Sequence, residues 1–468
     1  MFLPTRQRPF CAGAVLLACA ALAAAQETKL IPADAAMDNF YGSAVAIDGD
    51  LAVVGCPLDD AMGENAGAVH VYTNQGGTWT FTQKLTADPP AAGELFGSAL
   101  AISGNRLLVG APGNDQTGED CGAAYVFELS GGEFGQTAML TSPGAGADQR
   151  FGHAVALWQD VALVGVSVDY QKAPYLGSAY VFVHGADGWV HEDTLLAPTA
   201  KRAIPYDTTL AVNGDVAVIG APCQYDNGLA SGSAYVYRQF GGTWQHEATL
   251  APATARRAEY FGSAVAVFGD TIVVGARGMQ MRFQGSPVPG AAYVFDYGEG
   301  GWHLSQALAP EQYAQGFGRS VAFDGGVLLV GAPDAETSVA HGGAVHVYYH
   351  DGTQWAAGGV LTPTSLATWD QFGFPLATSG GRLIAGAIRD DQAATNAGAV
   401  YIMDLPALAG CPGDADGDRD VDASDLLLVL SNYARPAGGP ADGDFDRDGL
   451  VEADDLRLVT ERLDTRCD

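Results

Sequence analysis

The chain has 468 residues, enough for one large domain and one small one, and its 62 glycines and 48% hydrophobic content suit many short strands joined by tight turns. Its formal net charge of −31 opposes binding to nucleic acid or anionic lipid, because both require a basic surface. Beyond the N-terminal region, no segment approaches the ~20 consecutive apolar residues that a membrane-spanning helix needs.

Residues 1–25 have the pattern of an export signal. A basic start with Arg6 and Arg8 precedes an apolar stretch and three alanines, which form a small-residue cleavage site before Gln26. We therefore predict a signal peptide and a secreted or cell-surface protein. Lipid attachment at Cys19 is the alternative, because the residues before it loosely fit a lipoprotein site. Removal of the signal takes away two bases and no acid, which brings the charge to −33.

A segment ahead of the first repeat, ETKLIPA, matches the ends of the later repeats. Leu30 precedes Tyr41 by 11 residues, just as Leu85 precedes Phe96. The last repeat has no such segment after it. Since an open sheet edge would expose unpaired backbone groups, we predict that residues 28–32 form a strand that completes the last blade.

Seven copies of one unit follow at a fixed period. Each copy begins with a motif like FGSAVAI, continues with an apolar run that ends in glycine, and then has a motif like GAAYVF. The copies start at Tyr41, Phe96, Phe151, Tyr206, Phe261, Phe317 and Phe372, with a spacing of 55 residues that becomes 56 once. The apolar runs end at Gly55, Gly110, Gly165, Gly220, Gly275, Gly331 and Gly386. Such self-similarity predicts a repeat architecture.

Each unit is predicted to contain four strands. The first follows the FG pair, the second ends at the glycine, the third begins with GA, and the fourth has the form W…TQKL or W…EATL. Tight turns with glycine, such as Asp48-Gly49-Asp50, join the first two strands. Four strands repeated seven times predict an all-β, seven-bladed β-propeller over residues 26–405.

The repeats resemble the FG-GAP repeats of bacterial surface proteins and, more distantly, the integrin α-subunit head. The resemblance implies a binding or adhesion role. Integrin-type blades often carry a calcium cage of the form DxDxDG between their first two strands, whereas this chain has only short turns there, so we expect no calcium in the propeller. Unit four reads PYDTTLAV where FG is expected, and unit five replaces GAP with Gly275-Ala276-Arg277.

After a linker at residues 406–410, the composition becomes rich in aspartate. Two calcium-loop patterns stand 30 residues apart, and each leads into an apolar, helix-like segment that an acidic solvated tail would lack. The predicted ligands are Asp414, Asp416, Asp418, Asp420, Asp422 and Asp425 in the first loop, and Asp444, Asp446, Asp448, Leu450, Glu452 and Asp455 in the second. Asp420 and Leu450 would contribute backbone carbonyls.

The tandem loops look like a type I dockerin with Asp in place of Glu at the last loop position. The resemblance implies a small α-helical, EF-hand-like domain at residues 411–468, two calcium ions, and docking onto a cohesin-like or other cell-envelope protein. Partner choice in dockerins depends partly on two loop positions, which hold Ala423-Ser424 and Ala453-Asp454 here. The usual hydroxyl pair is incomplete, which puts binding to an ordinary cohesin in doubt.

The cysteines fall into two groups. Cys411 and Cys467 bracket the C-terminal module, and in an exported protein we predict a disulfide between them. Among Cys56, Cys121 and Cys223 at most one pair can form.

No catalytic motif with specific spacing is present. His70, His153 and His346 occupy repeat positions and are interpreted as structural, and pairs such as Asp59-Asp60 lie in turns, where Asp is an ordinary turn former. We therefore predict a non-catalytic binding or scaffold protein. The alternative is a polysaccharide-active hydrolase or lyase built on a propeller with a dockerin.

One face of the ring should be basic around units four and five. Repeat geometry places the loops between the second and third strands on the same face as the loops between units. The bases there, with a neighbouring aromatic residue, are Lys201, Arg202, Arg256, Arg257, Arg277, Arg282 and Phe283. They predict a recognition patch for an anionic glycan or another surface protein. A chance cluster of solvated bases is the competing interpretation.

Overall fold

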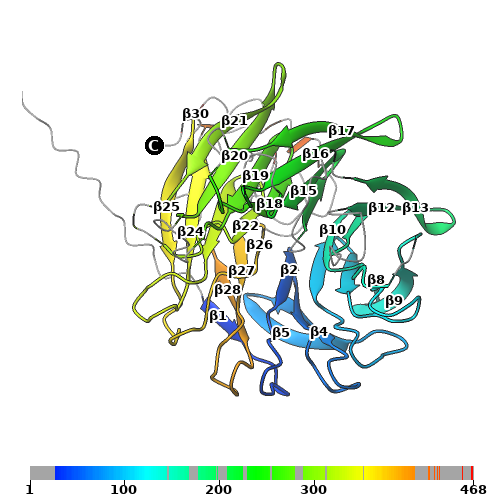
Figure 1. Ribbon diagram of the computed structural model, residues 1–468. Helices are drawn as coiled ribbons and strands as arrows, with labels where there is room; N and C mark the ends of the chain where they lie inside the picture. Colours follow the sequence, from blue (N-terminus) through cyan, green and yellow to red (C-terminus); the bar gives the residue numbers. More distant parts are fainter. Residues whose placement is uncertain are drawn as a thin grey trace, which may run out of the picture.

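A computed structural model of the protein shows a ring of four-stranded sheets (Figure 1). The structure describes residues 27–405 apart from short gaps at 145–146, 168–177, 197, 199–207, 225–228, 253–255, 280–287, 311, 313 and 351–352. Of the remaining chain it describes residues 420–421, 426, 429–430, 432, 456 and 465–466.

Seven sheets of four strands each form the ring, as the repeats predict. Blades 1 and 2 comprise β2 (Ala44–Asp48), β3 (Leu51–Cys56), β4 (Ala68–Gln75) and β5 (Thr78–Leu85), then β6 (Ala99–Ser103), β7 (Arg106–Ala111), β8 (Ala123–Ser130) and β9 (Glu133–Leu140). Blades 3 and 4 comprise β10 (Ala154–Trp158), β11 (Val161–Gly165), β12 (Ala179–Gly185) and β13 (Gly188–Leu195), then β14 (Thr209–Asn213), β15 (Val216–Ala221), β16 (Ser233–Phe240) and β17 (Thr243–Leu250).

Blades 5 and 6 comprise β18 (Phe261–Phe268), β19 (Thr271–Ala276), β20 (Ala291–Gly298) and β21 (Gly301–Leu308), then β22 (Ser320–Phe323), β23 (Val327–Ala332), β24 (Ala344–His350) and β25 (Trp355–Leu361). Blade 7 comprises β26 (Leu376–Ser379), β27 (Arg382–Ala387), β28 (Ala399–Asp404) and, from the other end of the chain, β1 (Glu27–Leu30).

The first strand of each blade faces the centre of the ring. Each of these strands contacts the first strand of the next blade, and the series returns from β26 to β2 (Figure 1). The second strands are buried along most of their length, whereas the fourth strands are largely exposed, as β3 and β5 illustrate. The second strands are continuous runs of apolar residues because neighbouring blades cover both of their faces.

The predicted closure of the ring is confirmed. β1 pairs antiparallel with β28, with Thr28 opposite Ile402 and Leu30 opposite Val400 (Figure 1). The last blade of the propeller thus obtains its outer strand, β1, from residues that precede the first blade. Its third strand, β28, is therefore paired on both sides, as the third strands of the other six blades are.

The FG motif joins successive blades. Phe96, which starts the second repeat, is fully buried, and its backbone N–H donates to the carbonyl of Ala66 in the preceding blade at 3.0 Å. Gly97 follows with a φ of +91°, and a Cβ added there would lie 2.6 Å from the carbonyl oxygen of Ala68. Glycine is needed because the backbones of two blades approach each other here.

Hydrophobic packing occurs between blades. One core cluster joins Val53 and Val69 of blade 1 to Leu107 and Tyr125 of blade 2, and comparable clusters bridge the other blade pairs. Each sheet therefore buries its faces against its neighbours, which is the energetic reason that repeats of this kind form a closed ring.

Little of the C-terminal module lies within the described residues. β29 (Asp420–Val421) pairs antiparallel with β30 (Thr465–Arg466). The helical domain, its calcium ligands and the disulfide between Cys411 and Cys467 otherwise fall outside the described residues and stay predictions. No described residue belongs to a helix that could span a bilayer.

Candidate ligand-binding site at the channel mouth

The seven first strands enclose a cavity of about 520 Å³. Its wall consists of residues at the start of these strands or just before them, together with Pro222 and Arg277, which follow second strands. A first strand begins at the same end of a blade as a second strand ends, so the cavity lies at one mouth of the central channel. Cavities of this size accommodate small ligands.

A ring of seven side chains surrounds the mouth at one repeat position, directly after the FG pair. The ring consists of Ser43, Ser98, His153, Thr208, Ser263, Arg319 and Phe374. Three serine hydroxyls each donate to the backbone carbonyl three residues earlier, at 2.6 Å (Ser43), 2.7 Å (Ser98) and 2.6 Å (Ser263). Because their protons are used in these bonds, the serines offer a ligand only acceptor lone pairs.

Two arginines supply the charged donors of the cavity. Arg277 takes the place of proline after the second strand of blade 5, and Arg319 takes the place of serine in blade 6. The residues before them touch, because a Cβ added at Gly318 would lie 3.0 Å from the backbone nitrogen of Ala276. The two arginines therefore start from adjacent points on one wall. No acid is among the described residues that line the cavity.

Each arginine lies over an aromatic ring. The guanidinium carbon of Arg277 is 4.8 Å from the ring centroid of Tyr260, and that of Arg319 is 4.4 Å from the ring centroid of Phe374. Arg319 also lies 3.8 Å from a carboxylate oxygen of Asp334. These contacts restrict the rotamers of both side chains before any ligand arrives.

The structure places only part of the predicted basic patch. Arg277 lines the cavity, whereas Arg256 and Arg257 are exposed in the loop before β18. Lys201, Arg202, Arg282 and Phe283 lie outside the described residues. Arg319 was missed by the sequence analysis, although its replacement of a serine at a repeat position was a readable signal.

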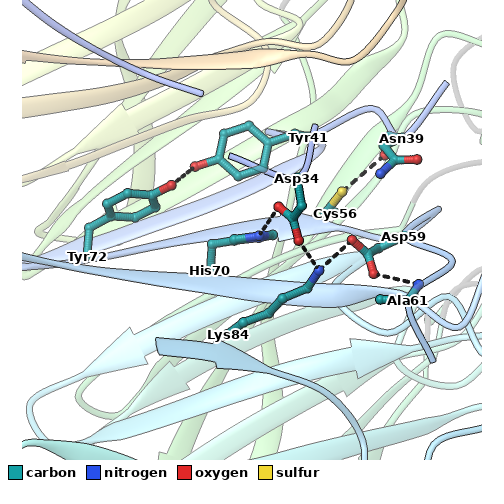
Figure 2. Close-up of polar contacts among 9 residues, drawn as sticks. All are labelled: Asp34, Asn39, Tyr41, Cys56, Asp59, Ala61, His70, Tyr72 and Lys84. Carbon is teal, nitrogen blue, oxygen red and sulfur yellow. Dashed lines mark hydrogen bonds and ion pairs between the residues drawn. The ribbon is translucent and has the colours of Figure 1, made fainter. Parts of the chain in front are cut away.

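Blade 1 and the segment before it contain a partly buried polar network (Figure 2). The ammonium group of Lys84 lies 2.6 Å from a carboxylate oxygen of Asp34 and 2.8 Å from one of Asp59. The second oxygen of Asp59 accepts from the backbone N–H of Ala61, as expected for a turn former. His70, 2% exposed, lies 3.5 Å from Asp34 through Nε2.

Burial decides which forms of these groups are stable. It lowers the pKa of His70 and raises the pKa of the Cys56 thiol to about 12, so the imidazole is neutral and the thiol is protonated at neutral pH. Burial also opposes the charge on Lys84, but hydrogen bonds to Asp34 and Asp59 outweigh it and raise the lysine pKa. The network thus neutralises its own charges, which supports the structural interpretation of His70.

Blade 7 has an equivalent arrangement. Lys29, on the closing strand β1, donates to Asp390 at 2.5 Å and to Gln392 at 2.7 Å. Its ammonium group lies 5.3 Å from the ring centroid of Tyr401, at the repeat position that His70 occupies in blade 1. This lysine connects the two ends of the propeller through side chains as well as through backbone pairing.

The described residues contain no group of three or more His, Cys, Asp or Glu side chains arranged to hold a metal ion. Cys56, Cys121 and Cys223 are buried thiols. The predicted calcium loops belong to the part of the chain beyond residue 405, so these observations do not bear on them.

Comparison with known proteins identifies the repeat. A family model described as the FG-GAP repeat matches residues 24–72, 79–127, 134–182, 189–237, 244–295 and 355–403, which together exceed half of the chain. Each match ends in the third strand of a blade. None of the curated proteins matches the chain. Among solved structures, one from Bacteroides uniformis ATCC 8492 is described as a proposed 6-phosphogluconolactonase. It is 12% identical to this chain, with a TM-score of 0.47, and the match covers 69% of this chain and 86% of the Bacteroides chain.

Proposed function

The chain belongs to the FG-GAP repeat family, and from this premise we propose that it is an extracellular, non-catalytic binding or scaffold protein. Its propeller would recognise an anionic glycan or a surface protein at the channel mouth. Its C-terminal module would attach it to a partner in the presence of calcium. The observation that carries the proposal is a mouth lined by Arg277 and Arg319, with no acid among its described lining residues, in a chain of net charge −31.

The chemistry of the cavity favours binding over catalysis. The described lining offers guanidinium donors, one imidazole and hydroxyl acceptors, but it has no carboxylate or thiol beside the imidazole of His153. General acid–base catalysis on a polysaccharide needs two groups of different pKa on either side of the scissile bond. A wall of fixed cations can hold and orient an anionic group without such a pair.

The attachment role rests on the Asp-rich loops. Alternating carboxylates at 414–425 and 444–455 fit the six to eight oxygen ligands that calcium takes. FG-GAP repeats are typical of extracellular proteins, where calcium is abundant, and the export signal predicted at residues 1–25 agrees with that location. A cohesin-like or other cell-envelope protein is the partner that the resemblance to dockerins favours.

Calcium titration by calorimetry tests the attachment module. The protein used is the mature chain, which begins at Gln26 after the predicted signal peptide. We expect two bound ions in the mature chain and none in the double variant Asp414→Ala/Asp444→Ala. Asp187→Ala, in an exposed hairpin turn of blade 3, is the matched control and should keep both ions. Full calcium binding by the double variant would exclude the two loops.

A second experiment tests recognition by the propeller. The mature chain is applied to an array of acidic, sulfated and neutral glycans and of cell-surface proteins, and bound glycans are recovered and analysed for cleavage. Binding of intact acidic glycans supports the proposed role. Cleaved glycans would instead favour the polysaccharide-active enzyme, and the absence of any bound glycan or surface protein would reject recognition by the propeller.

A further inference from the structure

Resting on the proposed function, we propose that Arg277 and Arg319 together bind one anionic group of an acidic sugar at the channel mouth. The group is a carboxylate or a sulfate, both of which present two or more oxygens to a pair of guanidinium groups. The hydroxyls of the same sugar then lie against the serines on the remaining wall.

The first support comes from the repeat itself. Where blade 5 has Arg277, four other blades have proline, at Pro57, Pro112, Pro222 and Pro333. Where blade 6 has Arg319, four other blades have a small hydroxyl residue, at Ser43, Ser98, Thr208 and Ser263. These are two different repeat positions, one directly after the second strand of a blade and the other directly before the first strand of the next blade. The fold brings the two departures to neighbouring points of one cavity, although neither residue is needed to build a blade.

The second support is the contact between the two blades at this point. A Cβ added at Gly275 would lie 2.3 Å from the carbonyl oxygen of Gly318. Gly318 in turn donates its N–H to Gly331 within its own blade at 3.0 Å. The backbones that carry the arginines are therefore in direct contact and fixed in register. Two guanidinium groups that start so close together can reach the same anion.

The third support is that an aromatic ring holds each guanidinium group in place. Tyr260 lies beneath Arg277, and Phe374 lies beneath Arg319. Asp334 offsets part of the charge of Arg319 at 3.8 Å, whereas no described carboxylate lies within ion-pair distance of Arg277. The wall consequently keeps a net positive charge. A ligand anion can complete this arrangement with little loss of side-chain entropy, because the aromatic contacts already restrict both arginines.

The serine hydroxyls at the channel mouth limit the class of ligand that can bind. Ser43, Ser98 and Ser263 have committed their protons to backbone carbonyls, so each can only accept a further hydrogen bond. A ligand that satisfies them must bring its own donors. An acidic sugar has hydroxyl donors beside its anionic group, whereas a free inorganic anion has an acceptor on every side. The volume of about 520 Å³ suits one or two sugar rings.

The net charge of the whole chain confines the attraction for acidic sugars to the channel mouth. A net charge of −31 repels acidic sugars at long range, and this repulsion is screened beyond about 8 Å at physiological salt. Attraction is then confined to the immediate surroundings of the two arginines. Binding should weaken as salt increases further, because the contacts themselves are charge-assisted.

Calorimetry on the mature chain with three matched probes tests the inference: galacturonate oligomers, sulfated galactose oligomers and uncharged galactose oligomers. We expect at least one acidic series to bind and the uncharged series to bind at least about tenfold more weakly. Arg277→Gln and Arg319→Gln should each reduce affinity for the acidic series at least about tenfold. Arg277→Lys keeps the charge but loses the two-pronged donor, so an intermediate loss is expected.

Arg389→Gln is the control, because Arg389 is an exposed arginine in the corresponding loop of blade 7 and does not line the cavity. It should leave affinity unchanged. Thermal unfolding checks that each variant is folded, and Arg277→Lys provides a conservative variant if a glutamine variant is not. Preference for one acidic series identifies the anion as carboxylate or sulfate.

Equal binding of uncharged oligomers, or acidic binding that survives loss of both arginines, would overturn the inference. A chain that binds a glycan or surface protein on the array but no acidic oligomer would overturn it as well, while the proposed binding function would stand. A chain that binds neither would reject recognition by the propeller itself.

Discussion

Lys29 and Asp390 form a 2.5 Å ion pair across 361 residues of sequence. The lysine lies on β1 and the aspartate follows β27, so the pair fastens the closing strand to the blade it completes. Only 15% of the lysine side chain and 3% of the aspartate side chain are exposed. Removing either side chain alone destabilises the fold, because the remaining charge is then buried without a partner.

We predict that Lys29→Met lowers the free energy of unfolding by about 3 kcal/mol at neutral pH, because it leaves the Asp390 carboxylate buried and unpaired. Adding Asp390→Asn should recover part of the loss. Chemical denaturation of the two variants and of the wild type measures both effects. A Lys29→Met protein as stable as the wild type would show that backbone pairing alone holds β1.

The same pair gives an alkaline limit. Burial lowers the pKa of Lys29, but hydrogen bonds and charge from Asp390 and Tyr401 outweigh burial and raise the pKa above 10.5. The pair therefore stabilises the fold fully below pH 10.5, and this contribution is lost as the pH rises through the raised pKa. The difference in stability between wild type and Lys29→Met should stay constant at neutral pH and shrink above 10.5.

Two glycines of blade 2 allow the cost of a steric clash to be compared with the cost of a positive φ alone. Both have positive φ, +78° at Gly122 and +58° at Gly104. A Cβ at Gly122 would lie 2.1 Å from the carbonyl oxygen of Phe151, whereas nothing lies within 4 Å of a Cβ at Gly104. Gly104→Ala should cost about 1 kcal/mol and Gly122→Ala about 3 kcal/mol or more. Similar losses, measured by thermal unfolding, would contradict close blade contact at Gly122.

His346 should make the propeller sensitive to acid. Burial lowers its pKa from 6.5 to about 4. The unfolded chain therefore binds a proton before the folded chain does, and stability falls by about 3 kcal/mol as the pH decreases from 6.5 to 4. Tyrosine occupies this position in five other blades, so His346→Tyr should fold and should lose this dependence. His303→Tyr, at an exposed position, is the control and should retain it.

Asp370 should act in the opposite direction. It is 1% exposed, its Oδ2 accepts from the N–H of Ala367 at 2.7 Å, and burial raises its pKa to about 6. Folding therefore favours the protonated form, and this group costs stability as the pH rises from 3.8 to 6. The stability of Asp370→Asn relative to wild type should increase by about 3 kcal/mol over that interval and stay constant above it.

Much of the fold could be predicted from the sequence because a repeat makes each position visible seven times. The spacing of Leu30 from Tyr41 predicted the closing strand, and the structure pairs Leu30 with Val400. Short glycine turns were equally readable, since Gly49 adopts the expected positive φ of +53°. These features depend on local sequence and on one rule, namely that sheet edges are paired.

The site was only partly predictable. Arg277 was singled out because it interrupts a GAP motif, but its neighbour Arg319 comes from a different repeat position. Only the three-dimensional contact of Ala276 with Gly318 brings them together. Likewise, nothing local indicates that Lys84 bridges Asp34 and Asp59, because Asp34 precedes the first repeat altogether.

The circular pairing of β1 with β28 also constrains the order of events during synthesis. The first strand emerges from the ribosome long before its partner, and it must wait until about 370 residues have followed. A chain that stops early cannot seal its ring, so its last sheet keeps a bare edge that proteases and chaperones can recognise. Only a chain that contains all seven blades can therefore close the ring and cover this edge.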